Sequence, residues 1–141
     1  MRILFVCTGN TCRSPMAAAL MRRRLDRAGR EDIIVDSAGL AADGGPVTQE
    51  AAAVMREIGL DIAGRRSQPL TLGLCRESDI IAVMTPAHAA ALTAYGAAPE
   101  KIRLLGRGIP DPFGGGRDLY RRTRDALEQA VDILAQEIVK G

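Results

Sequence analysis

Short apolar runs alternate along the chain with longer segments of helical periodicity. The apolar runs cover residues 3–6, 33–35, 79–84 and 101–105. The helical patterns cover residues 16–28, 48–58, 86–95 and 117–139. Strands that alternate with helices favour right-handed crossovers and a parallel sheet covered on both faces. The pattern therefore predicts an α/β fold: a doubly wound, four-stranded parallel sheet with helices on both faces and the first strand central.

Capping residues agree with the expected helix ends. Ser14 and Thr85 each precede a proline, which places a capping hydroxyl before a proline in the first helical turn. Glycines that can end a helix follow three of the helical patterns, at Gly29, Gly59 and Gly96. In such sheets, ligands bind beyond the carboxyl ends of the strands, so the loops after Val6 and after Leu105 are the candidate site.

Composition limits the possible partners and compartments. A chain of 141 residues fits one domain, which we expect to cover residues 1–141. Nineteen basic and 17 acidic residues give a net charge of +2, too balanced to favour nucleic acid. No apolar stretch reaches the roughly 18–20 residues that a membrane span needs, and no export signal is visible. Three cysteines suit free thiols in a reducing cytosol, so we expect a cytoplasmic protein; the oligomeric state stays open.

The loop between the first strand and the first helix carries the candidate chemistry. It runs from Cys7 to Arg13 with the spacing C-x5-R. Inward-facing N–H groups and the start of the helix would form a socket for a tetrahedral oxyanion. We expect Gly9 and Asn10 to allow positive φ in the loop, and Asn10 to bond across it. Arg13 would grip two oxygens of a phosphate with its planar guanidinium group.

Cys7 would lie at the bottom of this socket. The helix N-terminus, the loop N–H groups and Arg13 are conditions under which cysteine pKa values fall to about 3.5–7.5, so we expect a thiolate nucleophile. The Ser14 hydroxyl could donate a hydrogen bond to that sulfur. The alternative is that Cys7 is only a small buried apolar residue. The nucleotide motif G-x4-G-K-[ST] and the dinucleotide motif G-x-G-x-x-G are both absent.

These residues carry a resemblance to a known family. FVCTGNTCRSPMA resembles the signature of the low-molecular-weight protein tyrosine phosphatases, and Ser37-Ala38-Gly39 and Asp111-Pro112 are similar to two further landmarks. CTGNTCRSPM and DPFGGGRDLYRRTRD look most like the bacterial protein-arginine phosphatase branch.

The resemblance implies an enzyme that acts on phosphorylated proteins without a metal or other cofactor. Cys7 would form a cysteinyl phosphate, Arg13 would bind its oxygens, and Asp111 would be the general acid. Phe113 would be an aromatic wall beside the substrate. The phosphate-binding residues would be Thr8, Gly9, Asn10, Thr11, Cys12, Arg13 and Ser14.

Two positions bear on the substrate. Tyrosine phosphatases of the family usually have a second aromatic residue after the position of Phe113, where this chain has Gly114. They also usually have a larger apolar residue at the position of Thr11, at the rim of the socket. We therefore expect phosphoarginine, with phosphotyrosine as the alternative.

Other interpretations remain open at this point. An arsenate reductase would relay oxidation through two further cysteines, whereas only Cys75, expected to be a partly buried helix residue, lies outside the loop. A phosphate-binding module without activity would keep the socket alone. The single histidine, His88, is expected to have a surface or packing role. Cys12 is expected to form a disulfide with Cys7 under peroxide.

Overall fold

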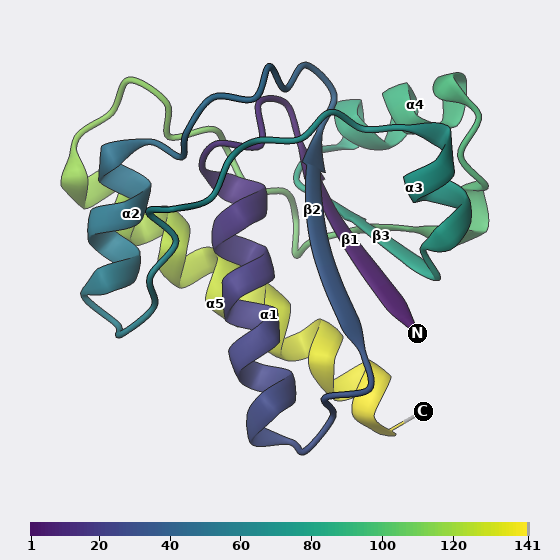
Figure 1. The fold of residues 1–141 in the computed structure, drawn as a ribbon, viewed down its shortest axis with the longest axis horizontal. Coiled ribbons are helices and arrows are strands. Elements are labelled where there is room, and N and C mark those ends of the chain that lie inside the picture. The colour runs from purple at the N-terminus through teal and green to yellow at the C-terminus, as the bar shows by residue number, and fades with distance from the viewer. Residues whose placement is uncertain (141) are drawn as a thin grey trace.

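The computed structural model describes residues 1–140, which form a sheet between two layers of helices (Figure 1). The elements in chain order are β1 (Arg2–Cys7), α1 (Arg13–Arg27), β2 (Ile34–Gly39), α2 (Gln49–Arg56), α3 (Leu72–Glu77), β3 (Ile80–Val83), α4 (Pro86–Tyr95), the 3-10 helix η1 (Pro99–Lys101), β4 (Ile102–Leu104) and α5 (Arg117–Lys140). The strands are parallel in the order β2-β1-β3-β4. This confirms the predicted four-stranded parallel sheet with the first strand inside it.

The side chains of β1 alternate between the two faces of the sheet. Ile3 and Phe5 are fully buried in the cluster formed with α1, α2 and α5. Leu4 and Val6 are fully buried in a second cluster, formed with α3 and α4. Figure 1 shows the same division, with α1, α2 and α5 on one side of the strands and α3 and α4 on the other. A strand buried on both faces explains the continuous apolar run of residues 3–6.

The carboxyl ends of β1 and β2 lie side by side, which fixes the start of the loop that follows β1. Cys7 is paired with Gly39 in the register of the two strands. Beyond the strands the pairing continues, because Leu40 N donates to the Cys7 carbonyl over 3.0 Å and Ala41 N donates to the Thr8 carbonyl over 2.8 Å. The residue after Cys7 is therefore held by the chain that leaves β2.

The bounds of several elements differ from those predicted. β2 extends to Gly39 through polar and small residues, because pairing with β1 decides its length and Arg2 pairs with Asp36 at 2.6 Å.

The predicted Ser14 cap is wrong: α1 begins at Arg13, and its N-cap, Cys12, makes no side-chain capping bond. Thr85 does cap α4. The expected helix-ending glycines all have positive φ, at Gly29, Gly59 and Gly96.

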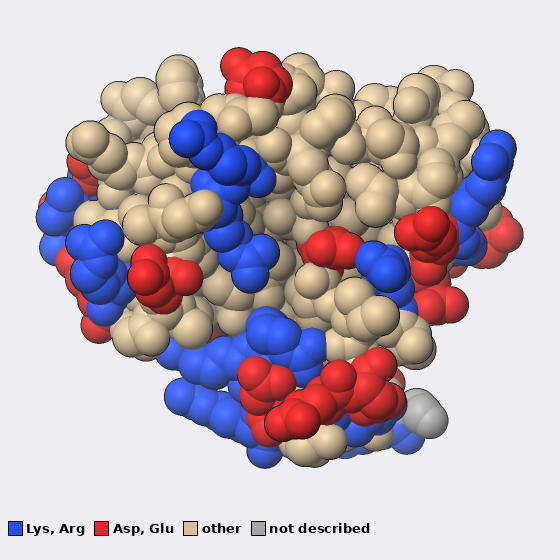
Figure 2. Space-filling view, in the orientation of Figure 1, with Lys and Arg blue, Asp and Glu red and all other residues tan. Residues whose placement is uncertain are grey.

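Basic and acidic side chains lie beside one another in the lower part of Figure 2, and ion pairs also join α1 to α5. Arg23 is within 3.2 Å of Glu128, and it also donates to the Ile58 carbonyl over 2.7 Å. Arg24 lies 3.9 Å from Asp132. These pairs are partly exposed, so each contributes little to stability. Among the described residues, no helix has both the length and the apolar character needed to cross a membrane.

Candidate active site

The loop between β1 and α1 curls over the sulfur of Cys7. Asn10 N donates to Cys7 Sγ over 3.3 Å, and Ser14 Oγ lies 3.0 Å from the same atom. Asn10 takes the left-handed conformation at φ 57°, as predicted. Gly9 does not have positive φ, so that part of the prediction is wrong. One left-handed residue is sufficient to turn this loop, and Asn is among the few residues that tolerate it.

A chain of hydrogen bonds fixes which way the Ser14 hydroxyl points. Gln68 N, which can only donate, bonds to Asn10 Oδ1 over 2.9 Å. The amide of Asn10 is thereby oriented, and its Nδ2 donates to Ser14 Oγ over 2.6 Å. The Ser14 hydrogen is then left to donate to Cys7 Sγ. Asn10 N and the Ser14 hydroxyl thus both direct a hydrogen atom at the Cys7 sulfur.

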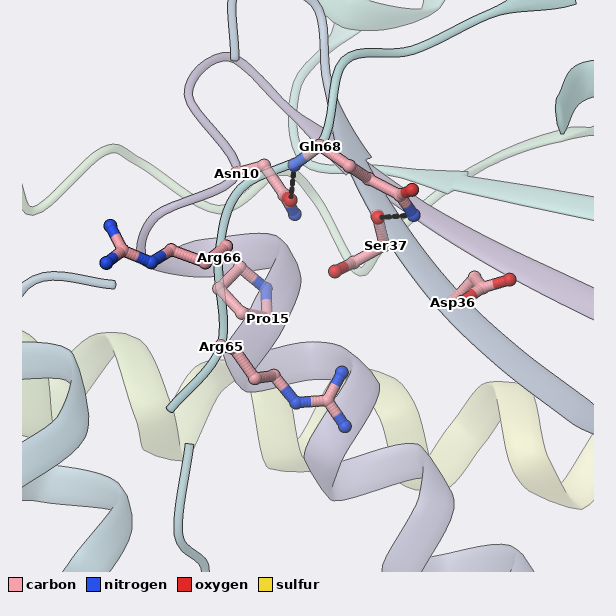
Figure 3. Close-up of a pocket in the computed structure, with 7 residues that line it drawn as sticks. All are labelled: Asn10, Pro15, Asp36, Ser37, Arg65, Arg66 and Gln68. Atoms are coloured by element: carbon pink, nitrogen blue, oxygen red, sulfur yellow. Dashed lines mark hydrogen bonds between the residues drawn. The ribbon is translucent and has the colours of Figure 1, made fainter. Parts of the chain in front are cut away.

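Figure 3 shows the support behind this loop. Asn10 and Gln68 line a pocket of about 160 Å³ together with Ser37 of β2, and Gln68 Nε2 donates to the Ser37 carbonyl over 2.7 Å. Cys7 and Arg13 do not line this pocket. It is therefore distinct from the phosphate socket, and Gln68 in its wall holds Asn10 in place.

Arg13 is buried at the socket with unused donors. Its side chain is only 4% exposed, and Nη1 donates to the Ile109 carbonyl over 2.8 Å. Its Nε is buried and has no partner among the described residues. A buried guanidinium group needs a compensating partner. A bound phosphoryl oxygen would supply one.

Backbone donors complete the socket. The N–H groups of Thr8, Gly9 and Thr11 have no acceptor among the described residues. These groups belong to one curled loop above Cys7 Sγ. Together with Arg13 they offer unpaired donors and one positive charge, the groups that a tetrahedral anion requires.

Asp111 lies at the same end of the sheet, on the loop between β4 and α5. Its Oδ2 is 3.7 Å from Arg13 Nη2, and its Oδ1 accepts from Phe113 N over 3.0 Å. The Asp111 side chain is 49% exposed. Phe113 is 75% exposed, so its ring is free to line the approach to the socket. The two loops named from the sequence therefore meet.

The three cysteines are in different environments, although all are buried and unpaired. Burial, followed by the charge of Cys7, raises the pKa of Cys12 to about 12, so Cys12 stays a thiol at neutral pH. Its Sγ is 3.7 Å from Asp111 Oδ1. Cys75 packs in the cluster with α3 and α4, on the other face of the sheet from Cys7. It is fully buried, not partly buried as expected.

Sequence patterns did not predict the loop contacts of three residues, although one of them, Gly39, belongs to the Ser37-Ala38-Gly39 landmark. Gln68 acts through its backbone N–H, which no side-chain pattern reveals. A Cβ on Gly39 would lie 2.7 Å from the Thr8 carbonyl oxygen. His88 Nε2 is 2.9 Å from Thr8 Oγ1. The buried imidazole is thus more than a packing element.

Within residues 1–140, no group of three His, Cys, Asp or Glu side chains is placed to hold a metal ion.

Comparison with known proteins identifies the class to which this fold and socket belong. Residues 2–141 match the family model described as low molecular weight phosphotyrosine protein phosphatase. The chain belongs to this family. It is a phosphoprotein phosphatase, and a cysteine-based mechanism is general to the family.

Individual relatives fall into two groups. The protein-arginine-phosphatase of Bacillus subtilis is 37% identical, over 99% of this chain and 98% of its own. The protein-tyrosine-phosphatase Wzb of Salmonella typhi is 36% identical, over 97% of this chain and 93% of its own. A structure of the YwlE arginine phosphatase, in a cysteine-to-serine mutant with a phosphorylated active-site serine, is similar with a TM-score of 0.92 and 36% identity, covering 98% of this chain and 95% of that one.

Proposed function

We propose that this phosphatase hydrolyses phosphoarginine side chains of proteins, through a cysteinyl-phosphate intermediate on Cys7. The observation that carries the choice of substrate is Thr11 at the rim of the socket. Its side chain is half-buried, and its hydroxyl bonds to no other described residue. The similarity to the Bacillus subtilis protein-arginine-phosphatase supports the same choice.

In the first step, Cys7 Sγ attacks the phosphorus atom and the bond from phosphorus to the guanidinium nitrogen breaks. Asp111, in its protonated form, gives its proton to the leaving nitrogen. Arg13 and the loop N–H groups bind the charge that spreads over the three equatorial oxygens. The short contacts of Asn10 and Ser14 with the sulfur support Cys7 as the nucleophile.

In the second step, water attacks the cysteinyl phosphate and Asp111 accepts the proton of that water. The bond between sulfur and phosphorus breaks, inorganic phosphate leaves, and Cys7 regains its thiolate. The Ser14 hydroxyl stabilises the departing sulfur by its hydrogen bond. The half-exposed carboxylate of Asp111 can exchange protons with solvent between the two steps, which supports both roles.

Phosphoarginine presents a planar polar group with several N–H donors. That group needs acceptors and room, and Thr11 offers a hydroxyl with little bulk. Thr11 Oγ1 lies 3.4 Å from the position that a Cβ on Gly9 would take, so it stands over the loop itself. Thr48 N donates to the Thr11 carbonyl over 2.9 Å, which holds this residue in place. Asp111 could accept guanidinium N–H bonds before it gives its proton.

Phosphotyrosine is the second candidate substrate, and the exposed ring of Phe113 is compatible with it. An aromatic side chain that is 75% exposed could stack against a phenol. The similarity to Wzb of Salmonella typhi supports this alternative. A guanidinium plane can also stack on an aromatic ring, so Phe113 alone does not separate the two substrates.

The test compares phosphoarginine and phosphotyrosine peptides of one sequence by kcat/KM. We expect the wild type to favour phosphoarginine, and Thr11→Ile to shift the ratio about tenfold toward phosphotyrosine. Thr11→Val keeps the size of the side chain and separates loss of the hydroxyl from added bulk. A wild type that prefers phosphotyrosine would contradict the proposed substrate. If Thr11→Ile leaves the ratio unchanged, Thr11 is not the selector.

The two remaining alternatives have less support. An arsenate reductase of this fold would relay oxidation through further cysteines, and Cys75 is buried on the opposite face of the sheet from Cys7. A binding module would leave an aryl phosphate intact. Hydrolysis by the wild type, with loss of activity in Cys7→Ser, would exclude the binding module.

We also propose that the protein acts in the cytoplasm on phosphorylated protein substrates, with no nucleic acid, membrane or metal as partner. The three buried, unpaired cysteines support a reducing compartment. A fluorescent fusion seen at the cell envelope or outside the cell would contradict this assignment.

A further inference from the structure

His88 connects α4 to the loop that follows Cys7. The imidazole is 6% exposed, and its Nε2 lies 2.9 Å from Thr8 Oγ1. Thr8 is the residue next to Cys7, 80 positions away from His88 in the chain. A buried histidine in contact with the phosphate socket is a costly choice for packing alone, because an apolar residue could fill the same space.

Three features keep His88 neutral. Burial lowers its pKa, and the charge of Arg13 lowers the pKa further, while Asp111 opposes the shift. His88 also lies in the first turn of α4, where the positive end of the helix dipole disfavours a second positive charge. A neutral imidazole has one donor and one acceptor nitrogen.

The hydrogen-bond pattern assigns the donor. Nδ1 of His88 is buried and has no partner among the described residues. An unpaired buried N–H group is rarer than an unpaired acceptor, so the proton belongs on Nε2. Nε2–H then donates to Thr8 Oγ1. The hydroxyl hydrogen of Thr8 is directed away from the imidazole and is free for another acceptor.

Thr8 is therefore fixed from two sides. Ala41 N, from the chain that leaves β2, holds the Thr8 carbonyl at 2.8 Å. His88, from α4, holds the Thr8 side chain. The peptide that carries the unpaired Thr8 N–H is held at its Cys7 carbonyl by Leu40 N over 3.0 Å. The contacts of Ala41 and His88 then fix the Thr8 residue on the other side of that N–H.

We propose that His88 is a positioning residue of the phosphatase, which holds Thr8 so that the first N–H group after the nucleophile faces the phosphoryl oxygens. The inference rests on the proposed role of Cys7, but it is independent of which phosphorylated side chain is the substrate. The effect should appear mainly in kcat, because preorganised donors matter most where charge develops in the transition state.

The experiment uses an aryl phosphate substrate, with inorganic phosphate as a competitive inhibitor. We expect His88→Ala and Thr8→Val each to lower kcat about tenfold, to raise the phosphate inhibition constant, and to change KM less. His88→Gln retains an N–H donor and should recover part of the loss. The double variant should be no slower than the slower single variant, because the two residues act through one contact.

Thr71→Ala is the matched control for stability. Thr71 caps α3 through Leu74 N, at a distance from the loop, so its loss should lower the melting temperature and leave kcat unchanged. If His88→Ala does not fold, Thr8→Val and His88→Gln still test the contact. A kcat within twofold of wild type in the folded variants, or losses that multiply in the double variant, would overturn the proposal. Failure of the proposed role of Cys7 would give a different result from failure of the His88 proposal, because Cys7→Ser would then stay active.

Discussion

Gly39→Ala should slow the enzyme although Gly39 is not among the residues proposed to bind the substrate. A Cβ at position 39 would lie 2.7 Å from the Thr8 carbonyl oxygen and 2.9 Å from both Asn10 Cβ and Asn10 N. These contacts must open to at least 3.0 Å, and to 3.4 Å for ordinary van der Waals contact. The neighbours are backbone atoms and the base of a short side chain, so no flexible group can move aside.

The strand cannot move away easily either. Gly39 N donates to the Gln68 carbonyl, and the Gly39 carbonyl accepts from Leu70 N, each over 2.9 Å. The loop above Cys7 must therefore shift by a few tenths of an ångström. A misplacement of 1 Å can cost about 100-fold in rate. A shift of a few tenths of an ångström therefore predicts a loss of about 5-fold to 25-fold in kcat/KM. Overpacking of about 1–3 kcal/mol should also lower the melting temperature by about 3–10 °C.

The assay measures kcat/KM on an aryl phosphate well below the melting temperature, together with thermal unfolding. Gly64→Ala is the matched control, because a Cβ there meets nothing within 4 Å and Gly64 does not have positive φ. It should leave both quantities unchanged. If Gly39→Ala retained kcat/KM within twofold of wild type, the argument that β2 sets the loop position would be refuted.

Three further predictions concern ionisable side chains. Asp111→Ala should slow hydrolysis most for substrates with poor leaving groups, as measured by kcat across a series of aryl phosphates; equal slowing would remove Asp111 as the acid. Peroxide should oxidise Cys7 to the sulfenic acid, which the Cys12 thiol converts to a disulfide with release of water; mass spectrometry that finds only overoxidised Cys7 would contradict this. Because the pKa of folded His88 lies below 6.5, the unfolded state binds its proton first as pH falls. Urea titrations at several pH values should therefore show that the free energy of unfolding decreases more below pH 6.5 in wild type than in His88→Gln. An equal decrease in the two proteins would refute the assignment of His88 as a buried neutral side chain.

Local patterns were enough to predict the fold and the main loop. The apolar run before Cys7, the proline after Thr85 and the glycines after the helices act within a few residues, so the sequence displays them directly. The spacing from Cys7 to Arg13 likewise places the proposed nucleophile and the proposed anion-binding side chain on one short loop. These features depend on backbone geometry that neighbouring residues decide.

Features that depend on tertiary contacts were missed or misassigned. Ser14 has the sequence context of a helix cap but does not cap α1, whereas the predicted contact of its hydroxyl with the Cys7 sulfur is present. Gln68 supports Asn10 from 58 positions away, and only through its backbone. The lone histidine, His88, has neighbours in sequence that give no sign of the loop it contacts. The contacts of Gln68 and His88 exist only because the sheet brings two distant segments together.

The loop and the acid are held in different ways, and the difference fits their proposed roles. The loop is fixed at the Cys7 carbonyl by Leu40, at Asn10 by Gln68, and at the Thr11 carbonyl by Thr48. Donors fixed in this way need no reorganisation when charge develops on the phosphoryl oxygens, so their stabilisation is available in the transition state. Asp111 must instead give a proton to one group and take a proton from another. Its half-exposed carboxylate, bonded to Phe113 N and weakly paired with Arg13, can exchange partners between the two steps.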